Sequence, residues 1–265
     1  MTVWVDGQFL PDAAAPVPGA STAPFETMGA HANELPLWPE HIARLAAAAR
    51  HCGLPFHAPP SLRDAAGELL ARNGHGEGVL RLVLLPEQPL ARAPRARDSV
   101  RVVLSTRPRR QLPFVRLLPT IVPRPVGAPA ADLKAFPRTF HDAVLHQAQA
   151  GGADDGIVVG AGGSVLETAT GNLWLRLEDG WVTPALDGRV LPGIARARLL
   201  AAARSSGRPV VERVCDLGDL HRARALAHSN AVYGPRAACL LETPTPDVAI
   251  ADTELGVLWR GMTSG

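Results

Sequence analysis

Lysine is almost absent from this chain of 265 residues. Lysine and arginine together number 27, yet Lys134 is the only lysine and the remaining 26 are arginines. The two side chains are alike as solvated cations but not as nucleophiles, because a guanidinium stays protonated whereas a deprotonated ε-amine can attack a carbonyl. Lys134 is therefore a candidate Schiff-base former. The alternative is a single surface lysine left by a compositional bias toward arginine.

Other absences exclude whole classes of protein. No run of eighteen apolar residues occurs, and the start "MTVWVDGQFLPD" lacks the basic-then-apolar pattern of a signal peptide, so we expect a cytoplasmic protein that does not enter a membrane. The formal net charge of +2 gives little support to nucleic-acid binding. No GxGxxG or Walker sequence indicates a dinucleotide or nucleoside triphosphate, and no internal repeat is present.

Cysteine is scarce, and the positions of Cys52, Cys215 and Cys239 argue against two kinds of site. Their odd number and wide separation disfavour a disulfide framework, and none has the CxxC spacing of a metal site. We expect three reduced, mostly buried thiols and no metal. The only dense cluster of basic residues is 91–110, which we interpret as a solvated loop followed by a strand. A surface for an anionic partner is the less favoured alternative.

The residues that are present predict an α+β domain at the N-terminus. Hydrophobic residues make up 46% of the chain, enough for a sizeable core. Two short strands around an Asp-Gly turn are expected in "TVWVDGQFL", followed by a helix in "WPEHIARLAAAARHCGLP" with Pro39 in its first turn. Ser61 can cap a second helix, and strands follow at 78–86 and 99–107 with a Pro/Arg loop between them.

A second domain is expected after the proline-punctuated stretch 108–132, which has no helical period. We place the domains at 1–120 and 121–265, the second of α/β type. Its predicted elements are a helix in "TFHDAVLHQAQAGGADD", a meander of short strands over 156–186, a helix in "IARARLLAAARSSG", a strand in "PVVERVC", a helix in "LGDLHRARAL" and a last core strand in "PRAACLLE".

Five motifs along the chain carry a resemblance to a known family. They are "FETM" (25–28), "EHIARL" (40–45), "LKAFPR" (133–138), "LETATGN" (166–172) and "TPALDGRVLPGIAR" (183–196). In order and spacing the chain resembles the class IV aminotransferases, the pyridoxal-phosphate enzymes of fold type IV. The resemblance implies an α/β fold like that of D-amino-acid and branched-chain aminotransferases, a cofactor in the cleft between two domains, and a homodimer.

The resemblance also implies roles for individual residues toward pyridoxal 5'-phosphate. Lys134 would hold the cofactor as a Schiff base and then move the substrate proton. Glu167 would lie beside the pyridine nitrogen and keep it protonated, which makes the ring an electron acceptor. Arg44 would bind the phosphate, a task suited to a bidentate guanidinium.

Further phosphate contacts are implied on two other segments. Gly193, Ile194 and Ala195 would offer main-chain N–H groups at the start of a helix, and Ser229 and Asn230 would reach the phosphate from "AHSNAVYG". The chain departs from the family where it has Ala195 and Ala231 in place of hydroxyl residues. It also has "PGASTAP" in place of a glycine-rich run near the substrate pocket. Weaker cofactor binding, or a non-catalytic protein that retains the fold, is therefore an alternative.

The choice of reaction depends on the residues that follow the lysine. Branched-chain transaminases usually place a tyrosine five positions beyond the lysine, where this chain has Thr139. Lyases often have Lys-x-x-x-Arg, and Arg138 completes that pattern here. We therefore expect 4-amino-4-deoxychorismate lyase, a folate-biosynthesis enzyme that releases pyruvate and 4-aminobenzoate, with Arg138 and Asn172 toward the small substrate. The alternative is an aminotransferase of the D-amino-acid or branched-chain type.

Overall fold

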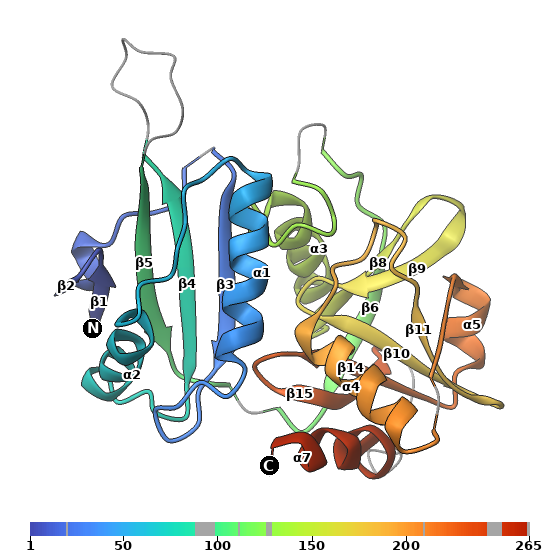
Figure 1. The fold of residues 1–265 in the computed structure, drawn as a ribbon. Coiled ribbons are helices and arrows are strands. Elements are labelled where there is room, and N and C mark those ends of the chain that lie inside the picture. The colour runs from blue at the N-terminus through green and yellow to red at the C-terminus, as the bar shows by residue number, and fades with distance from the viewer. Residues whose placement is uncertain are drawn as a thin grey trace. The chain divides into compact units, whose positions relative to one another are not determined.

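The computed structural model describes residues 1–19, 21–87, 99–110, 112–125, 129–208, 210–242 and 251–263, and Figure 1 labels its elements. The chain divides into two compact units. Unit 1 consists of Met1–Arg110 together with Leu133–Pro137, and unit 2 consists of Gln111–Asp132 together with Arg138–Gly265. The chain therefore leaves unit 1, returns to it for the five residues around Lys134, and leaves again.

Unit 1 is a six-stranded antiparallel sheet with two helices. Its strands follow the order β2-β1-β5-β4-β3-β7, and every neighbouring pair is antiparallel. The elements are β1 (Thr2–Val5), β2 (Gln8–Pro11), η1 (Asp12–Ala14), β3 (Ala23–Gly29), α1 (Trp38–His51), α2 (Leu62–Arg72), β4 (Val79–Pro86), β5 (Val100–Arg107) and β7 (Ala135–Phe136). In Figure 1 the helix α1 runs along β3.

The core of unit 1 forms where apolar faces of α1 and α2 meet one face of the sheet. Leu45 of α1 and Leu69 of α2 are buried with Leu82 of β4 in one cluster. The helix expected after Pro39 and the hairpin at the Asp-Gly turn are confirmed. Ser61 stands at the N-cap of α2, but its side chain makes no capping hydrogen bond, so that expectation is wrong.

Unit 2 contains a nine-stranded mixed sheet in the order β12-β11-β10-β14-β15-β6-β8-β9-β13. The pairs β11–β12, β15–β6 and β6–β8 are parallel, and the others are antiparallel. The elements are β6 (Val115–Thr120), α3 (Thr139–Ala150), β8 (Asp155–Val159), η2 (Ala161–Gly163), β9 (Ser164–Thr168), β10 (Asn172–Leu177), β11 (Gly180–Pro184), α4 (Ile194–Ser205), β12 (Val211–Arg213), β13 (Cys215–Asp216), α5 (Leu217–Arg222), β14 (Ala225–Asn230), β15 (Gly234–Leu240), η3 (Asp252–Gly256) and α7 (Val257–Thr263).

Long-range strand pairing changes three expectations for unit 2. The stretch 108–132 holds a central strand, because β6 lies between β15 and β8. The expected meander over 156–186 is interrupted, since β10 pairs with β11 and β14 rather than with β9. The single strand expected in "PVVERVC" is two short strands, β12 and β13, at opposite edges of the sheet.

The division into units also differs from the expected domains 1–120 and 121–265. The strand β6 pairs within the sheet of unit 2, so the change of unit falls after Arg110. The residues around Lys134 belong to unit 1 because β7 pairs with β3.

The Arg-rich stretch 91–110 is only partly described. The predicted Pro/Arg loop and the arginines at 92, 95 and 97 lie outside the described residues. In the described part, Arg101 is within ion-pair distance of Asp6 and Glu87, and Arg109 pairs with Glu77. These carboxylates offset positive charge that an anionic partner would need.

Candidate active site

Lys134 is fixed in unit 1 by the pairing of β7 with β3. Its carbonyl accepts a hydrogen bond from the Phe25 N–H at 3.0 Å, and the Phe25 and Phe136 rings pack with centroids 4.5 Å apart. The Lys134 Nζ lies 4.8 Å from the Phe25 ring centroid, over the face of the ring. Backbone pairing and an aromatic contact thus hold the chain's only ε-amine, and its side chain is partly buried.

Arg44 and His41 project from α1 onto the buried carboxylate of Glu26. The Arg44 Nε and Nη2 donate to the two Glu26 oxygens, each at 2.7 Å, and His41 Nδ1 lies 2.7 Å from Oε2. Burial would raise the pKa of Glu26, but the Arg44 charge and the hydrogen bonds from Arg44 and His41 lower it to about 2. Glu26 is therefore ionised at neutral pH, and Arg44 forms a two-point salt bridge with it.

Burial has the opposite effect on His41. It lowers the pKa of the imidazole despite the Glu26 hydrogen bond, so the ring favours its neutral form. The His41 Nε2 has no hydrogen-bond partner within the described part of the chain. The sequence motifs contain both Glu26 and His41, but sequence reasoning assigned neither a role. The phosphate contact expected of Arg44 stays a prediction.

Glu167 is the most sequestered of the expected cofactor residues in unit 2. It lies on β9 and is 4% exposed. The Leu191 N–H donates to its Oε2 at 3.0 Å, and His141 Nε2 lies 3.3 Å from its Oε1. Neither contact was found from the sequence, because Leu191 and His141 are each more than twenty residues away and carry no local signal. A buried carboxylate whose oxygens are held in place can accept a hydrogen bond from a protonated ring nitrogen.

The Leu-Pro-Gly-Ile segment brings a helix start to the same part of unit 2. Gly193 is the N-cap residue of α4, and no side chain caps the helix. The first N–H groups of α4, including those of Ile194 and Ala195, therefore have no intrahelical acceptor and can bind an anion. A Cβ on Gly193 would lie 1.9 Å from Asn172 Oδ1, and Asn172 Nδ2 donates to the Leu191 carbonyl at 2.9 Å.

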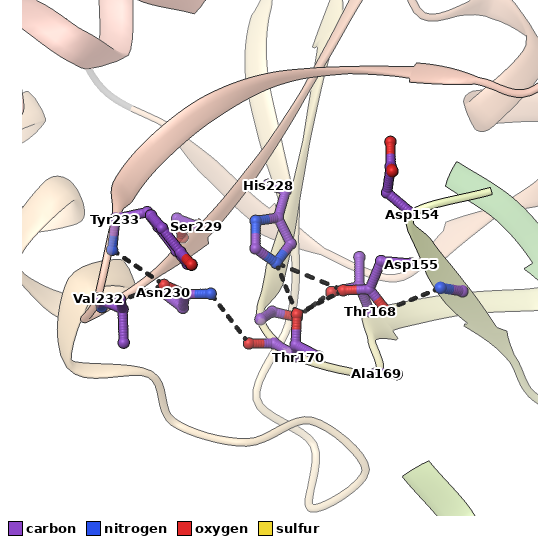
Figure 2. Close-up of polar contacts among 12 residues, drawn as sticks. Asp154, Asp155, Thr168, Ala169, Thr170, His228, Ser229, Asn230, Val232 and Tyr233 are labelled. Atoms are coloured by element: carbon purple, nitrogen blue, oxygen red, sulfur yellow. Dashed lines mark hydrogen bonds and ion pairs between the residues drawn. The ribbon is translucent and has the colours of Figure 1, made fainter. Parts of the chain in front are cut away.

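Ser229 and Asn230, at the end of β14, already have partners inside unit 2. The Ser229 hydroxyl is fully buried and accepts a hydrogen bond from Trp174 Nε1 at 2.8 Å. Asn230 Oδ1 accepts the N–H groups of Val232 and Tyr233, each at 3.1 Å, as Figure 2 shows. These bonds shape the β14–β15 turn, and the phosphate contacts of both residues stay predictions.

Arg138 is tied to the turn that links β9 to β10. Its Nη2 donates to the Ala169 carbonyl at 3.1 Å, and its Nε donates to Asp142 at 3.2 Å. Asn172 begins β10 directly after this turn, which spans residues 169–171. The structure thus gives Arg138 and Asn172 internal contacts, while their proposed roles toward substrate remain untested.

A polar network that includes the buried Asp155 and His228 also contacts this turn through Thr170 (Figure 2). The Thr170 hydroxyl donates to Asp155 Oδ2 at 2.6 Å and lies 3.3 Å from His228 Nε2. Burial raises the pKa of Asp155. Burial and the charge of Arg236 lower the pKa of His228 to about 3, so its ring is neutral. Because the Thr170 proton is directed to Asp155, the hydroxyl can accept from His228 only if Nε2 carries the ring proton.

The free thiols match expectation, since Cys215 and Cys239 are buried and none of the three is in a disulfide. Among the described residues, no group of three histidine, cysteine, aspartate or glutamate side chains could hold a metal ion. A search of the same residues finds no helix with the length and hydropathy that crossing a membrane requires.

Comparison with known proteins identifies the family. Residues 23–238 match the family "Amino-transferase class IV", so the chain belongs to it. A solved structure named "Putative 4-amino-4-deoxychorismate lyase", from Legionella pneumophila subsp. pneumophila str. Philadelphia 1, is 24% identical. It covers 95% of this chain and 97% of its own, with a TM-score of 0.81. The expected fold, that of fold type IV pyridoxal-phosphate enzymes with two sheets, is confirmed.

Two further relatives carry aminotransferase names. The PLP-bound form of a hypothetical aminotransferase from Mycobacterium tuberculosis is 21% identical, covers 100% of this chain and 99% of its own, and has a TM-score of 0.80. A "Probable branched-chain-amino-acid aminotransferase" from Thermotoga maritima is 35% identical over 105 residues. That match spans 39% of this chain and 38% of the Thermotoga protein, so the chain matches less than half of that relative's length.

Proposed function

We propose that the protein binds pyridoxal 5'-phosphate on Lys134 and acts as 4-amino-4-deoxychorismate lyase. The cofactor assignment is supported by the only lysine of the chain, which is held in unit 1, and by a buried carboxylate in unit 2, Glu167, whose two oxygens each have a hydrogen-bond partner. The uncapped start of α4 adds donors suited to a phosphate. These groups fit the cofactor's aldehyde, its ring nitrogen and its phosphate, respectively.

When bound, the cofactor supplies an electron acceptor for the carbanion that forms at the substrate carbon. Lys134 provides the amine that attaches to the cofactor, and once freed it can take the substrate proton at Nζ. Glu167 would accept a hydrogen bond from the protonated ring nitrogen. Arg138 is the proposed partner of a substrate carboxylate, in addition to its contacts with Asp142 and Ala169.

The lyase is favoured over a transaminase by the residues after the lysine. Arg138 completes the Lys-x-x-x-Arg pattern, and Thr139 replaces the tyrosine usual in branched-chain transaminases. The Legionella structure carries the lyase name, whereas the Mycobacterium and Thermotoga relatives carry the name of the second candidate, an aminotransferase, of the branched-chain type in Thermotoga. A D-amino-acid aminotransferase belongs to the same second candidate.

Cofactor attachment can be tested at a single position. Reduction of the PLP-loaded protein with borohydride, followed by mass spectrometry, should place the pyridoxyl adduct on the peptide that contains Lys134. Lys134→Arg should abolish the visible absorbance of the bound cofactor but leave the fold intact, because the charge is kept and the nucleophile is lost. Labelling confined to the N-terminal amine would rule out the assignment.

The reaction can be tested by omitting the amino acceptor. A lyase regenerates its cofactor in each cycle, so aminodeoxychorismate alone should give 4-aminobenzoate and pyruvate over many turnovers. A transaminase stalls after one turnover without a keto acid. The companion assay supplies D- and L-amino acids with 2-oxoglutarate or pyruvate. Rapid amino transfer there, with no 4-aminobenzoate formed, would replace the lyase by the second candidate. Silence in both assays with cofactor bound would point to a non-catalytic protein.

We also propose a homodimer, as the family resemblance implies. Sedimentation velocity at micromolar concentration should then give the mass of two chains. A single-chain mass at that concentration would contradict the proposal.

A further inference from the structure

The two oxygens of Glu167 are held by donors of different kinds. The Leu191 N–H belongs to the backbone and cannot be altered by a side-chain substitution, whereas the donor to Oε1 is the side chain of His141. At 4% exposure the carboxylate has little access to water. The orientation of its two oxygens therefore depends on these two contacts, because buried polar atoms are held by their hydrogen-bond partners.

His141 is itself held in place by α3. It is the third residue of that helix, and its ring packs edge-on against Phe140, with centroids 5.2 Å apart and planes at 75°. A hydrogen bond to a carboxylate requires that Nε2 carries the ring proton.

We propose that His141 is a positioning residue that acts through Glu167. By donating to Oε1 it holds the carboxylate in an orientation that would accept a hydrogen bond from the protonated ring nitrogen of the cofactor. The inference rests on the proposed function, since it assigns His141 to the same cofactor site. It predicts that loss of the Nε2 donor weakens cofactor binding although His141 is not itself placed against the cofactor.

The first test compares substitutions on one helix. His141→Phe keeps an aromatic ring beside Phe140 but removes the donor, and His141→Gln restores an N–H donor. His146 is exposed on the same helix, so His146→Phe is the matched control. We expect the Kd for PLP to rise about tenfold in His141→Phe, in line with loss of a hydrogen bond to a charged group, and to recover largely in His141→Gln. The control should bind like the wild type.

The second test asks whether the effect passes through Glu167. In a Glu167→Gln background, His141→Phe should produce little further change in the Kd, because the charged partner is already gone. The pH dependence of the bound cofactor's absorbance should shift in His141→Phe and return in His141→Gln. A merely structural role would instead give additive losses and no rescue.

The outcomes separate this inference from the proposed function. If the wild type fails to form the Lys134 adduct, the proposed function fails first. If the wild type binds PLP and His141→Phe has the same Kd and absorbance, only the role of His141 is overturned. Circular dichroism of each apo-protein checks folding, and His141→Leu takes the place of the Phe variant if that variant does not fold.

Discussion

Gly193 links the two cofactor contacts that we propose for unit 2, the phosphate site at the start of α4 and the ring-nitrogen contact at Glu167. It begins α4, whose free N–H groups we assign to the phosphate, and its Cα faces the Asn172 amide so closely that a Cβ would lie 1.9 Å from Oδ1. Asn172 cannot retreat without breaking its 2.9 Å hydrogen bond to the Leu191 carbonyl. Leu191 in turn donates to Glu167.

We therefore expect Gly193→Ala to weaken both stability and cofactor binding. The added methyl must displace Asn172 or the start of α4, at a cost of about 1–3 kcal/mol in the free energy of unfolding. Urea unfolding and PLP titration measure the two effects. Gly19→Ala is the matched control, because a Cβ there meets nothing within 4 Å. If both variants have the same free energy of unfolding and the same affinity for PLP, the close approach of Gly193 to Asn172 does not contribute to either.

At the scale of elements, three hydrogen bonds hold the turn 169–171 between β9 and β10. Arg138 donates to the Ala169 carbonyl, Asn230 Nδ2 donates to the Thr170 carbonyl at 3.3 Å, and the Thr170 hydroxyl donates to Asp155. Because β9 carries Glu167 and β10 begins with Asn172, these bonds fix the spacing of two proposed site residues.

The Thr170 hydroxyl can be removed without a change in side-chain volume. Thr170→Val should lower the free energy of unfolding by about 1–3 kcal/mol, because the buried Asp155 carboxyl loses a donor. Thr170→Ser keeps the hydroxyl and should stay much closer to the wild type. Chemical denaturation compares the three proteins. A valine variant as stable as the wild type would mean that this hydrogen bond does not stabilise the turn.

The sequence predicts those elements whose own residues carry a signal, such as a proline, a turn pair or an apolar face. The helix α1 has a proline in its first turn and an apolar face, and the hairpin of β1 and β2 has Asp6 and Gly7 with positive φ. The strand β6 has no such signal, because its place between β15 and β8 depends on residues far along the chain.

The same limit applies to the candidate site. Lys134, Glu167 and the start of α4 lie in recognisable motifs. The partners that hold Glu167 come from α3 and from the segment before α4, and no short-range pattern predicts which side chain will meet a buried carboxylate. The sequence also gives no local sign of the contact between Asp155 and His228. Their side chains lie 3.6 Å apart, but their strands are far apart in the sequence.

At the scale of the whole molecule, buried groups with shifted pKa values, His228, Glu26, His41 and Asp155 among them, make the free energy of unfolding depend on pH. The pKa of His228 falls from 6.5 to about 3 on folding, so the unfolded chain binds the proton first and stability decreases as the pH drops through that range. The pKa of Glu26 falls from 4.5 to about 2, so acidification through that range removes further stability. The raised pKa of Asp155 acts in the opposite direction.

We expect the unfolding free energy to fall as the pH is lowered from 6.5, with His228 contributing up to about 1.4 kcal/mol per pH unit. Urea unfolding, followed by tryptophan fluorescence at a series of pH values, measures the slope. His228→Gln should reduce the slope of unfolding free energy against pH between pH 6.5 and 3. His57 is exposed, so His57→Gln should leave that slope unchanged. Identical slopes in both variants would contradict a buried, neutral His228.

The single lysine also limits where a lysine-specific protease can cut the chain. A lysine-specific protease has one internal bond to cut in all 265 residues, between Lys134 and Ala135, and Ala135 is paired with β3 in unit 1. A chain must be locally extended and released from its sheet before a protease can bind it. Digestion of the native protein therefore gives a two-fragment readout, residues 1–134 and 135–265, whose rate reports how often β7 leaves β3. A molecule that modifies Lys134 would remove even that cut.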